Sequence, residues 1–274
     1  MNLREGPYGS LCRLGLILPS MNVTTEPEWC RLAPREVSFH TTRMLLQGAM
    51  TPESFARMDE DVAGAARLLA TARVDAIAYA CTAGSFLGDS DKIIRVIERE
   101  SGVPAVTMSK AVVEAMRVLG VKRVAVGTPY VAFVNEQERK FLQDAGFEVT
   151  RIIGLGLGKT YEERLMIARQ KEQVTYELAK KVDSPGAEGV LISCGALASI
   201  GVLERLETEL GKPVVSSSVA IFWATLRRTG AEVSISGYGS LLKRCPPLPD
   251  DPRGRANMEE GVPGGKPAER DSGG

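Results

Sequence analysis

Two cysteines in this sequence each follow an apolar run and precede small residues. The first run is VDAIAYACTAG, residues 74–84, and the second is GVLISCGALASI, residues 189–200. Short apolar runs bounded by glycine predict buried strands that end in turns. Open α/β sheets bind their ligands at the carboxyl ends of such strands, so Cys81 and Cys194 are candidate catalytic residues.

A pair of thiols can transfer protons or attack carbon. A thiolate can remove or return a proton, and it can add to an electron-poor carbon. Other residues for such chemistry are scarce, because His40 is the only histidine of the chain. The five cysteines match neither a disulfide framework nor a zinc motif, and GLGLGKT (154–160) lacks the first glycine of a phosphate loop. We therefore expect neither a metal nor a cofactor.

An internal repeat favours a functional role for both cysteines. Taken alone, a cysteine at a strand end is more often a small buried hydrophobe than a catalyst. Here residues 102–121 align with residues 211–231 at an offset of 109, and Cys81 aligns with Cys194 at an offset of 113. Such similar offsets predict two similar halves whose cysteine turns face one cleft. We also expect a helix after each cysteine to lower the pKa of the nucleophilic thiol.

Predicted strands and helices alternate along the chain, which is typical of a mainly parallel sheet with right-handed crossovers. A helix over residues 52–72 is expected from the Thr51-Pro52 start and the helical spacing of the apolar residues that follow. Further strands are expected at 14–19, 36–43, 105–108, 123–127, 148–155, 213–216 and 233–236, and further helices at 90–100, 109–119, 135–145, 161–182, 200–210 and 220–228.

The composition is that of a globular protein with no strong charge preference. Hydrophobic residues make up 44% of the 274 residues, and 34 basic side chains balance 34 acidic ones. A zero net charge does not favour nucleic acid or an anionic membrane as a partner. No apolar run approaches the roughly 18 residues that span a bilayer, and the first residues lack the apolar core of a signal peptide. A cytoplasmic location is expected.

Several motifs resemble the aspartate/glutamate racemase superfamily, in the branch of maleate cis-trans isomerases and arylmalonate decarboxylases. PSMNVTTE (19–26) and FHTTRM (39–44) resemble the N-terminal half of the isomerases. ISCG (192–195), PVVSSS (213–218) and GYG (237–239) are more similar to the decarboxylases.

This resemblance covers about residues 12–242 and implies the fold. It implies an α/β architecture of two flavodoxin-like, doubly wound parallel-sheet domains, related by a pseudo-twofold axis, with the active site between them. One domain would comprise residues 12–108 plus 217–242, and the other residues 109–216. Residues 245–274 are rich in proline and glycine and are expected to be disordered.

The resemblance also implies roles for single residues. Cys81 and Cys194 match the two catalytic cysteines of the isomerases. The implied substrate-binding residues are Ser20, Asn22, Tyr130, Thr82, Ala83, Gly195 and Ala196, the last four through their backbone N–H groups. Two positions depart from the families: the isomerases use an asparagine near Gly156, and the decarboxylases have a hydroxyl residue at Ala83 and no cysteine at position 81.

Three functions are compatible with these residues. The first is a cofactor-independent isomerase of a small carboxylate or dicarboxylate, either a cis-trans isomerase or a racemase, which uses both cysteines and an enediolate intermediate. The second is a decarboxylase in which Cys194 alone donates the proton. The third is a non-catalytic carboxylate-binding protein. For any of these functions, the amphipathic helices of the chain are also compatible with a homodimer.

Overall fold

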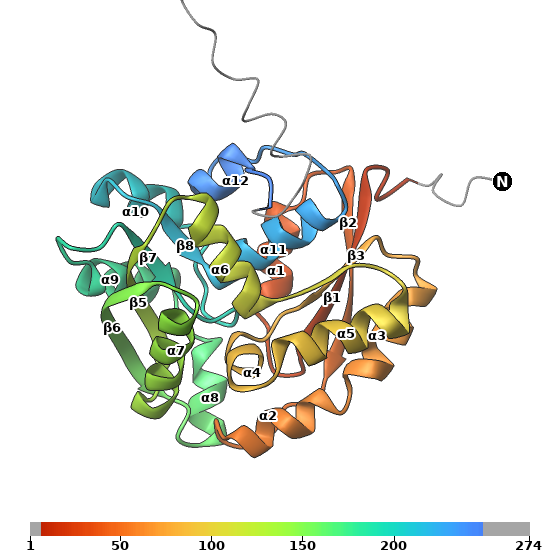
Figure 1. Cartoon of the computed structure of the whole chain (residues 1–274), viewed down its shortest axis with the longest axis horizontal. Helices are drawn as coiled ribbons and strands as arrows, with labels where there is room; N and C mark the ends of the chain where they lie inside the picture. Colours follow the sequence, from red (N-terminus) through yellow and green to blue (C-terminus); the bar gives the residue numbers. More distant parts are fainter. Residues whose placement is uncertain (1–6, 249–274) are drawn as a thin grey trace, which may run out of the picture.

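Four parallel strands form the first sheet, in the order β2-β1-β3-β4 (Figure 1). They are β1 (Cys12–Pro19), β2 (Val37–Met44), β3 (Ala76–Tyr79) and β4 (Ala105–Thr107). The computed structural model describes residues 7–248. In the central strand β1, Leu14, Leu16 and Leu18 are fully buried. Strands of a parallel sheet that is covered on both faces need a continuous apolar run, and LGLILP is such a run.

The second sheet repeats the order of the first, as β6-β5-β7-β8. Its strands are β5 (Arg123–Tyr130), β6 (Glu148–Leu157), β7 (Gly189–Ile192) and β8 (Val214–Ser216). Both orders correspond to the 2-1-3-4 part of a flavodoxin-like sheet. All strand pairs are parallel. The predicted α/β fold class with two similar doubly wound halves is therefore confirmed.

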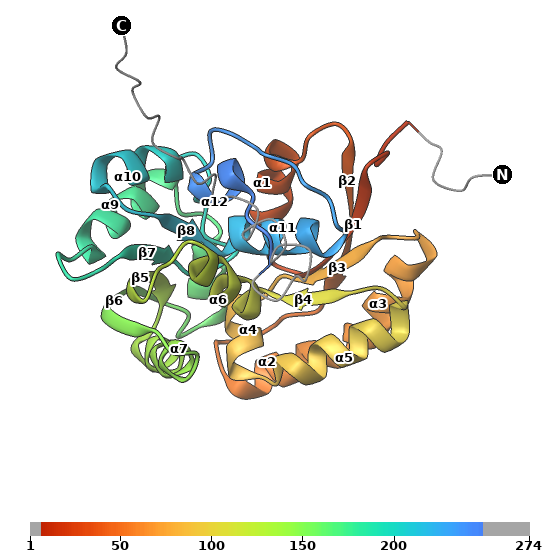
Figure 2. The ribbon, with the colours of Figure 1, turned by 45° about the horizontal axis from the view of Figure 1, so that its top comes forward.

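Helices cover both faces of each sheet (Figures 1 and 2). Around the first sheet lie α1 (Thr25–Leu32), α2 (Pro52–Asp59), α3 (Val62–Thr71), α4 (Thr82–Leu87) and α5 (Ser90–Ser101). Around the second lie α7 (Ala132–Asp144), α8 (Tyr161–Ile167), α9 (Glu172–Val182) and α10 (Leu203–Leu210). A short helix, α12 (Ser240–Arg244), comes last.

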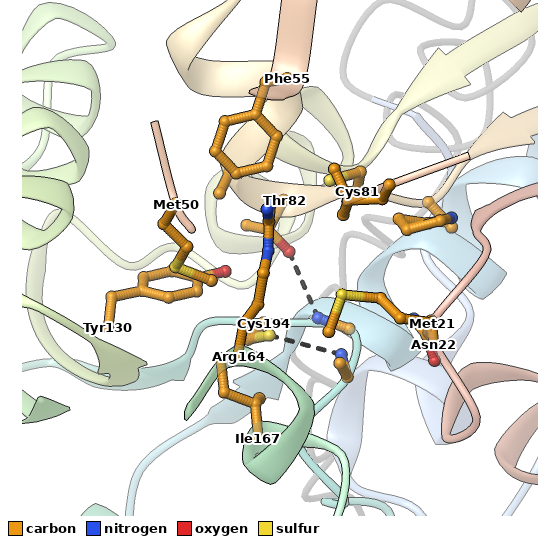
Figure 3. A pocket seen from close by; sticks show the side chains of 16 residues that line it. Met21, Asn22, Met50, Phe55, Cys81, Thr82, Tyr130, Arg164, Ile167 and Cys194 are labelled. Carbon is orange, nitrogen blue, oxygen red and sulfur yellow. Dashed lines mark hydrogen bonds between the residues drawn. The ribbon is translucent and has the colours of Figure 1, made fainter. Parts of the chain in front are cut away.

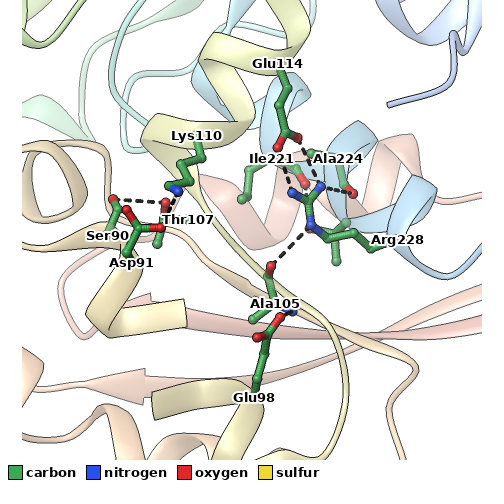
Figure 4. A network of polar contacts seen from close by, with 11 residues as sticks. Ser90, Asp91, Glu98, Ala105, Thr107, Lys110, Glu114, Ile221, Ala224 and Arg228 are labelled. Carbon is green, nitrogen blue, oxygen red and sulfur yellow. Dashed lines mark hydrogen bonds and ion pairs between the residues drawn. The ribbon is translucent and has the colours of Figure 1, made fainter. Parts of the chain in front are cut away.

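Two further helices, α6 (Met108–Val118) and α11 (Ser217–Arg228), pack against each other between the sheets. Each follows the last strand of its sheet, so α6 leads the chain into the second half and α11 returns it to β3 and β4. Arg228 of α11 donates to both carboxylate oxygens of Glu114 on α6 and to the Ala105 carbonyl of β4 (Figure 4). This mostly buried, bidentate pair fixes the two halves relative to each other.

Three predicted elements were wrong. The helix expected over residues 52–72 is two helices, α2 and α3, which break at Glu60 and Asp61. Side chains at the junction make tertiary hydrogen bonds: Asp59 accepts from the Tyr79 hydroxyl, and Asp61 accepts from the Leu45 amide. These contacts turn α3 away from α2 and onto the first sheet.

The helix expected over residues 161–182 also breaks, between Ile167 and Glu172. Its two parts pack in different directions, because α8 buries Arg164 while α9 buries Leu178 against β5. No strand forms over residues 233–236, where the Ile235 amide donates to the Leu242 carbonyl instead.

The first residues of the predicted tail, 245–248, lie against α11. Trp223 of α11 donates its indole N–H to the Pro246 carbonyl at 3.0 Å. The remainder of the predicted tail, residues 249–274, lies outside the described residues. Within residues 7–248, every helix is too short or too polar to cross a membrane. The domain boundaries stated above stay a prediction.

Candidate active site

A small pocket lies where the carboxyl ends of the two sheets meet (Figure 3). Its volume is about 50 Å³, room for a few water molecules. It is lined by Pro19, Met21, Asn22, Leu46, Met50, Phe55, Ala80, Cys81, Thr82, Ala83, Tyr130, Arg164, Ile167, Cys194, Gly195 and Ala196. Both candidate cysteines are therefore in one pocket, one from each half of the chain.

The two cysteines occupy related but different local structures. Cys81 follows β3 and is the N-cap of α4, and its Sγ accepts the Gly84 amide at 3.4 Å. Cys194 follows β7 and lies in a turn, where its Sγ accepts the Ala196 amide at 3.4 Å. The helix predicted over residues 200–210 forms as α10, but it starts at Leu203, so Cys194 does not lie at a helix N-terminus. Each sulfur nevertheless receives one backbone N–H group.

Cys194 has a strained backbone. Its φ is 129°, a region that residues with a Cβ rarely adopt. Such strain costs on the order of 1–3 kcal/mol and persists where the surrounding structure imposes it. Here Ser217 accepts the Cys194 amide at 3.1 Å, and Thr25 and Thr24 donate to the carbonyls of the next two residues. These bonds hold the thiol at the pocket.

We expect Cys194→Gly to be more stable than Cys194→Ala by about 1 kcal/mol, because glycine adopts a positive φ without strain. The order should reverse at Cys81, whose φ is −130°. Urea unfolding of the four variants measures both differences. A Cys194→Ala protein as stable as Cys194→Gly, or more so, would show that the φ of Cys194 carries no strain.

Burial controls the ionisation of both thiols. Burial raises the pKa of Cys81 to about 12, although the Gly84 amide and the Arg164 guanidinium act to lower it. Burial also raises the pKa of Cys194, against hydrogen bonds from Tyr130 and the Ala196 amide. The expectation that helix N-termini lower the thiol pKa was wrong, since removing the thiolate from water outweighs one or two N–H donors.

Tyr130, at the end of β5, is 1% exposed, and its hydroxyl hydrogen-bonds the Cys194 thiol. Burial raises the pKa of Tyr130 well above its ordinary value. The phenol is therefore protonated at neutral pH and is available as a hydrogen-bond donor beside Cys194.

The four predicted carboxylate-binding residues Thr82, Ala83, Gly195 and Ala196 all line the pocket. The Gly195 amide donates to the Thr82 hydroxyl at 3.3 Å, and the Ala196 amide donates to the Cys194 sulfur. The first contact links the two cysteine turns across the halves. Within residues 7–248, the amides of Thr82 and Ala83 donate to no acceptor. These two N–H groups are therefore the ones left free to bind a ligand.

Asn22 lines the pocket, whereas Ser20 does not. The Asn22 side chain accepts the amides of Thr24 and Thr25 and donates to the Thr25 hydroxyl at 2.9 Å, which shapes the start of α1. The Ser20 hydroxyl accepts the Leu46 amide at 3.0 Å and so supports the loop above the pocket. Substrate binding by either residue stays a prediction.

A buried carboxyl group lies behind the pocket. Glu138 of α7 is 2% exposed, and burial raises its pKa to about 7. The Ser193 side chain lies beside this carboxyl group, and a hydrogen bond from it acts to lower the pKa but does not offset the burial. An ionised Glu138 raises the pKa of Tyr130 and of Cys194, because a nearby negative charge opposes a second one.

The pocket also contains residues that the sequence analysis missed, above all Arg164. The sequence offered one signal: Arg164 and Ile167 lie three positions apart and so share one face of a helix. Met50 and Phe55, from the loop and helix after β2, were assigned no role either. Within residues 7–248, no three His, Cys, Asp or Glu side chains form a group that could hold a metal ion.

Comparison with known proteins identifies relatives of two kinds. A family model described as arylmalonate decarboxylase matches residues 14–242. The arylmalonate decarboxylase of Bordetella bronchiseptica is 33% identical over 235 residues, which cover 84% of this chain and 95% of that protein. The maleate isomerase of Geobacillus stearothermophilus is 28% identical over 247 residues, which cover 84% of this chain and 96% of that protein.

A solved structure with the same fold bears on the cysteines. It is a mutant of the Nocardia farcinica maleate cis-trans isomerase with a covalently bound succinylcysteine intermediate. Its TM-score is 0.78 at 26% identity, and the match covers 85% of this chain and 98% of that one. In that relative, a cysteine sulfur forms a bond to the substrate carbon skeleton.

Proposed function

Since this chain belongs to the arylmalonate decarboxylase family, as its motifs predicted, we propose that it is a cofactor-independent isomerase of a small carboxylate. The observation that carries the proposal is the presence of Cys81 and Cys194 in one pocket, each from a different half of the chain. Both thiols are then active, Tyr130 assists Cys194, and the amides of Thr82 and Ala83 bind a substrate carboxylate. A maleate-like cis acid is the preferred substrate.

The reaction needs one thiolate and a stabilised enediolate. The thiolate adds to one carbon of the double bond, so that an Sγ–C bond forms and the π electrons move onto the neighbouring carboxylate. The former double bond is now single and rotates. The electrons then return, the Sγ–C bond breaks, and the trans acid leaves with the thiolate restored. Backbone N–H groups and the neutral Tyr130 hydroxyl stabilise the negative charge of the intermediate.

Generating the thiolate is the difficult step in so buried a site. The pKa of Cys81 is about 12, so few molecules carry the thiolate at neutral pH. The guanidinium of Arg164 lowers that pKa and is a buried positive charge that lines the pocket. The Tyr130 hydroxyl favours the thiolate of Cys194 in the same way. Besides its backbone donor, each cysteine therefore has one side-chain partner that stabilises its charged form.

A decarboxylase is the second candidate, favoured by the family model and the 33% identity to the Bordetella enzyme. In that reaction Cys194 protonates the enediolate left after CO2 departs. Two features speak against it: Ala83 stands where the decarboxylases have a hydroxyl residue, and Cys81 stands where they have no cysteine.

Proton NMR in heavy water tests the proposal. The protein is incubated separately with maleate and with an aryl malonate. We expect the trans isomer to accumulate from maleate while the aryl malonate stays intact. Release of CO2 from the aryl malonate, with maleate unchanged, would replace the isomerase by the decarboxylase. A reaction of neither acid, extended to aspartate and other small carboxylates, would remove the maleate assignment.

A further inference from the structure

Arg164 is a buried cation at the edge of the thiol pocket. The residue is 2% exposed and lies on α8, in the second half of the chain. Its Nη1 group has three acceptors in the first half, the carbonyls of Gly48 and Ala49 and the Ser54 hydroxyl, at 3.1–3.2 Å. Arg164 thus holds the loop before α2 against α8, and Figure 1 shows the start of α2 next to the lower end of α8.

The guanidinium has no anionic partner within the described part of the chain. The ionisable side chains that act on it most strongly include Cys81, Tyr130 and Cys194, and among the described residues no carboxylate forms an ion pair with it. Burial lowers the pKa of Arg164, although an arginine stays protonated. A buried charge without a counter-charge is costly. The structure therefore has a positive charge that an incoming anion would neutralise.

The guanidinium is also oriented for such a contact. An arginine has five N–H donors, and the hydrogen bonds within residues 7–248 use only Nη1. The group lies over the Phe55 ring, 4.6 Å from its centroid, which fixes its plane (Figure 3). Nε and Nη2 are free among the described residues, and a planar fork of this kind suits a carboxylate.

We propose that Arg164 binds an anionic group of the ligand and makes the pocket selective for dicarboxylates. One carboxylate binds at the amides of Thr82 and Ala83, and the second binds at Arg164. Met50 and Phe55 flank the second position and leave room for little beyond a short carbon chain. The assignment of two carboxylates rests on the proposed function, but the anion site itself is testable without any turnover.

Two alkylating reagents of equal size test the anion site. Iodoacetate carries a carboxylate and iodoacetamide does not, so the ratio of their rates at Cys81 and Cys194 reports a positive charge in the pocket. The alkylation is carried out at alkaline pH, and mass spectrometry then measures the modification of each cysteine separately. The exposed Cys30 serves as an internal reference. Because both reagents attack the same thiolate, a change in thiol pKa cancels in the ratio.

We expect Arg164→Gln to lower the iodoacetate-to-iodoacetamide ratio at the pocket thiols by at least about tenfold, since a charged hydrogen bond is lost. Arg164→Lys should retain most of the ratio. Arg169→Gln, which removes an exposed charge just after α8, should leave it unchanged. An unchanged ratio in a folded Arg164→Gln protein would show that Arg164 is only a clamp for the loop.

The wild-type protein provides a second measurement, which does not depend on the folding of a variant. Succinate and butyrate have the same chain length and differ by one carboxylate. We expect succinate to protect Cys81 and Cys194 from iodoacetamide at a concentration at least about tenfold lower than butyrate. Equal protection by the two acids would overturn the dicarboxylate assignment. Both readouts stand if maleate is not turned over, so failure of the proposed reaction is distinguishable from failure of the anion site.

Discussion

The single variants Cys81→Ser and Cys194→Ser should each lower kcat by at least about 1000-fold on the identified substrate. A hydroxyl fits the space of the thiol, but it is far less acidic and a much poorer nucleophile and leaving group. Both residues are 8% exposed and sit at strand ends, so the melting temperature should change little. Steady-state kinetics and thermal unfolding of each variant measure the two effects.

The control is Cys12→Ser, because Cys12 is also buried but lies at the start of β1 and does not line the pocket. It should keep full activity. The two enzyme candidates also separate here: a decarboxylase would survive Cys81→Ser and lose activity only with Cys194→Ser. Full activity of both pocket variants would remove the thiol mechanism altogether, and the chain would then be a carboxylate-binding protein on an enzyme scaffold.

Limiting iodoacetamide at pH 7 should modify the exposed Cys30 well before Cys81. The rise in the pKa of Cys81 from 9.0 to about 12 leaves about 1000-fold less thiolate than an ordinary thiol has. A more basic thiolate is more nucleophilic, which recovers about 20-fold. We therefore expect Cys81 to react about 50-fold more slowly than an ordinary thiol, before any steric hindrance.

The pH dependence has a definite sign. A thiol whose pKa is raised gains thiolate only as the pH approaches that pKa, so the rate at Cys81 should keep rising above pH 10. Peptide mass spectrometry across pH 7 to 11 gives the rate at each cysteine. A rate at Cys81 that levels off near pH 8 would mean that the pocket donors, and not burial, control this thiol.

Much of the fold could be predicted from local patterns. The apolar runs of β1, β3 and β7 predicted buried strands, because a strand covered on both faces must be apolar along its whole length. The offset between Cys81 and Cys194 predicted two equivalent sheets, and the matching strand orders confirm them. The strand-end position of both cysteines also follows from sequence, since parallel strands present their carboxyl ends on one side.

Other features depend on contacts between distant segments. The breaks in the helices expected at residues 52–72 and 161–182 follow from tertiary packing, which outweighed a continuous helical pattern. Arg164 is a typical exposed helix residue by its sequence, and only the packing of α8 against the loop at Gly48 buries it. Whether a charged side chain loses its contact with water depends on segments distant in the sequence, so the local sequence does not encode that loss.

The ionisation of the thiols was likewise decided by the tertiary structure. The sequence predicted that a helix follows Cys81, although it did not predict the short α4, and α4 does supply a donor, the Gly84 amide. Whether the donor lowers the pKa depends on how completely the surrounding segments bury the sulfur, and here that burial prevails. Hydrogen bonds to a cysteine are largely local, whereas desolvation sums over every segment that packs around it.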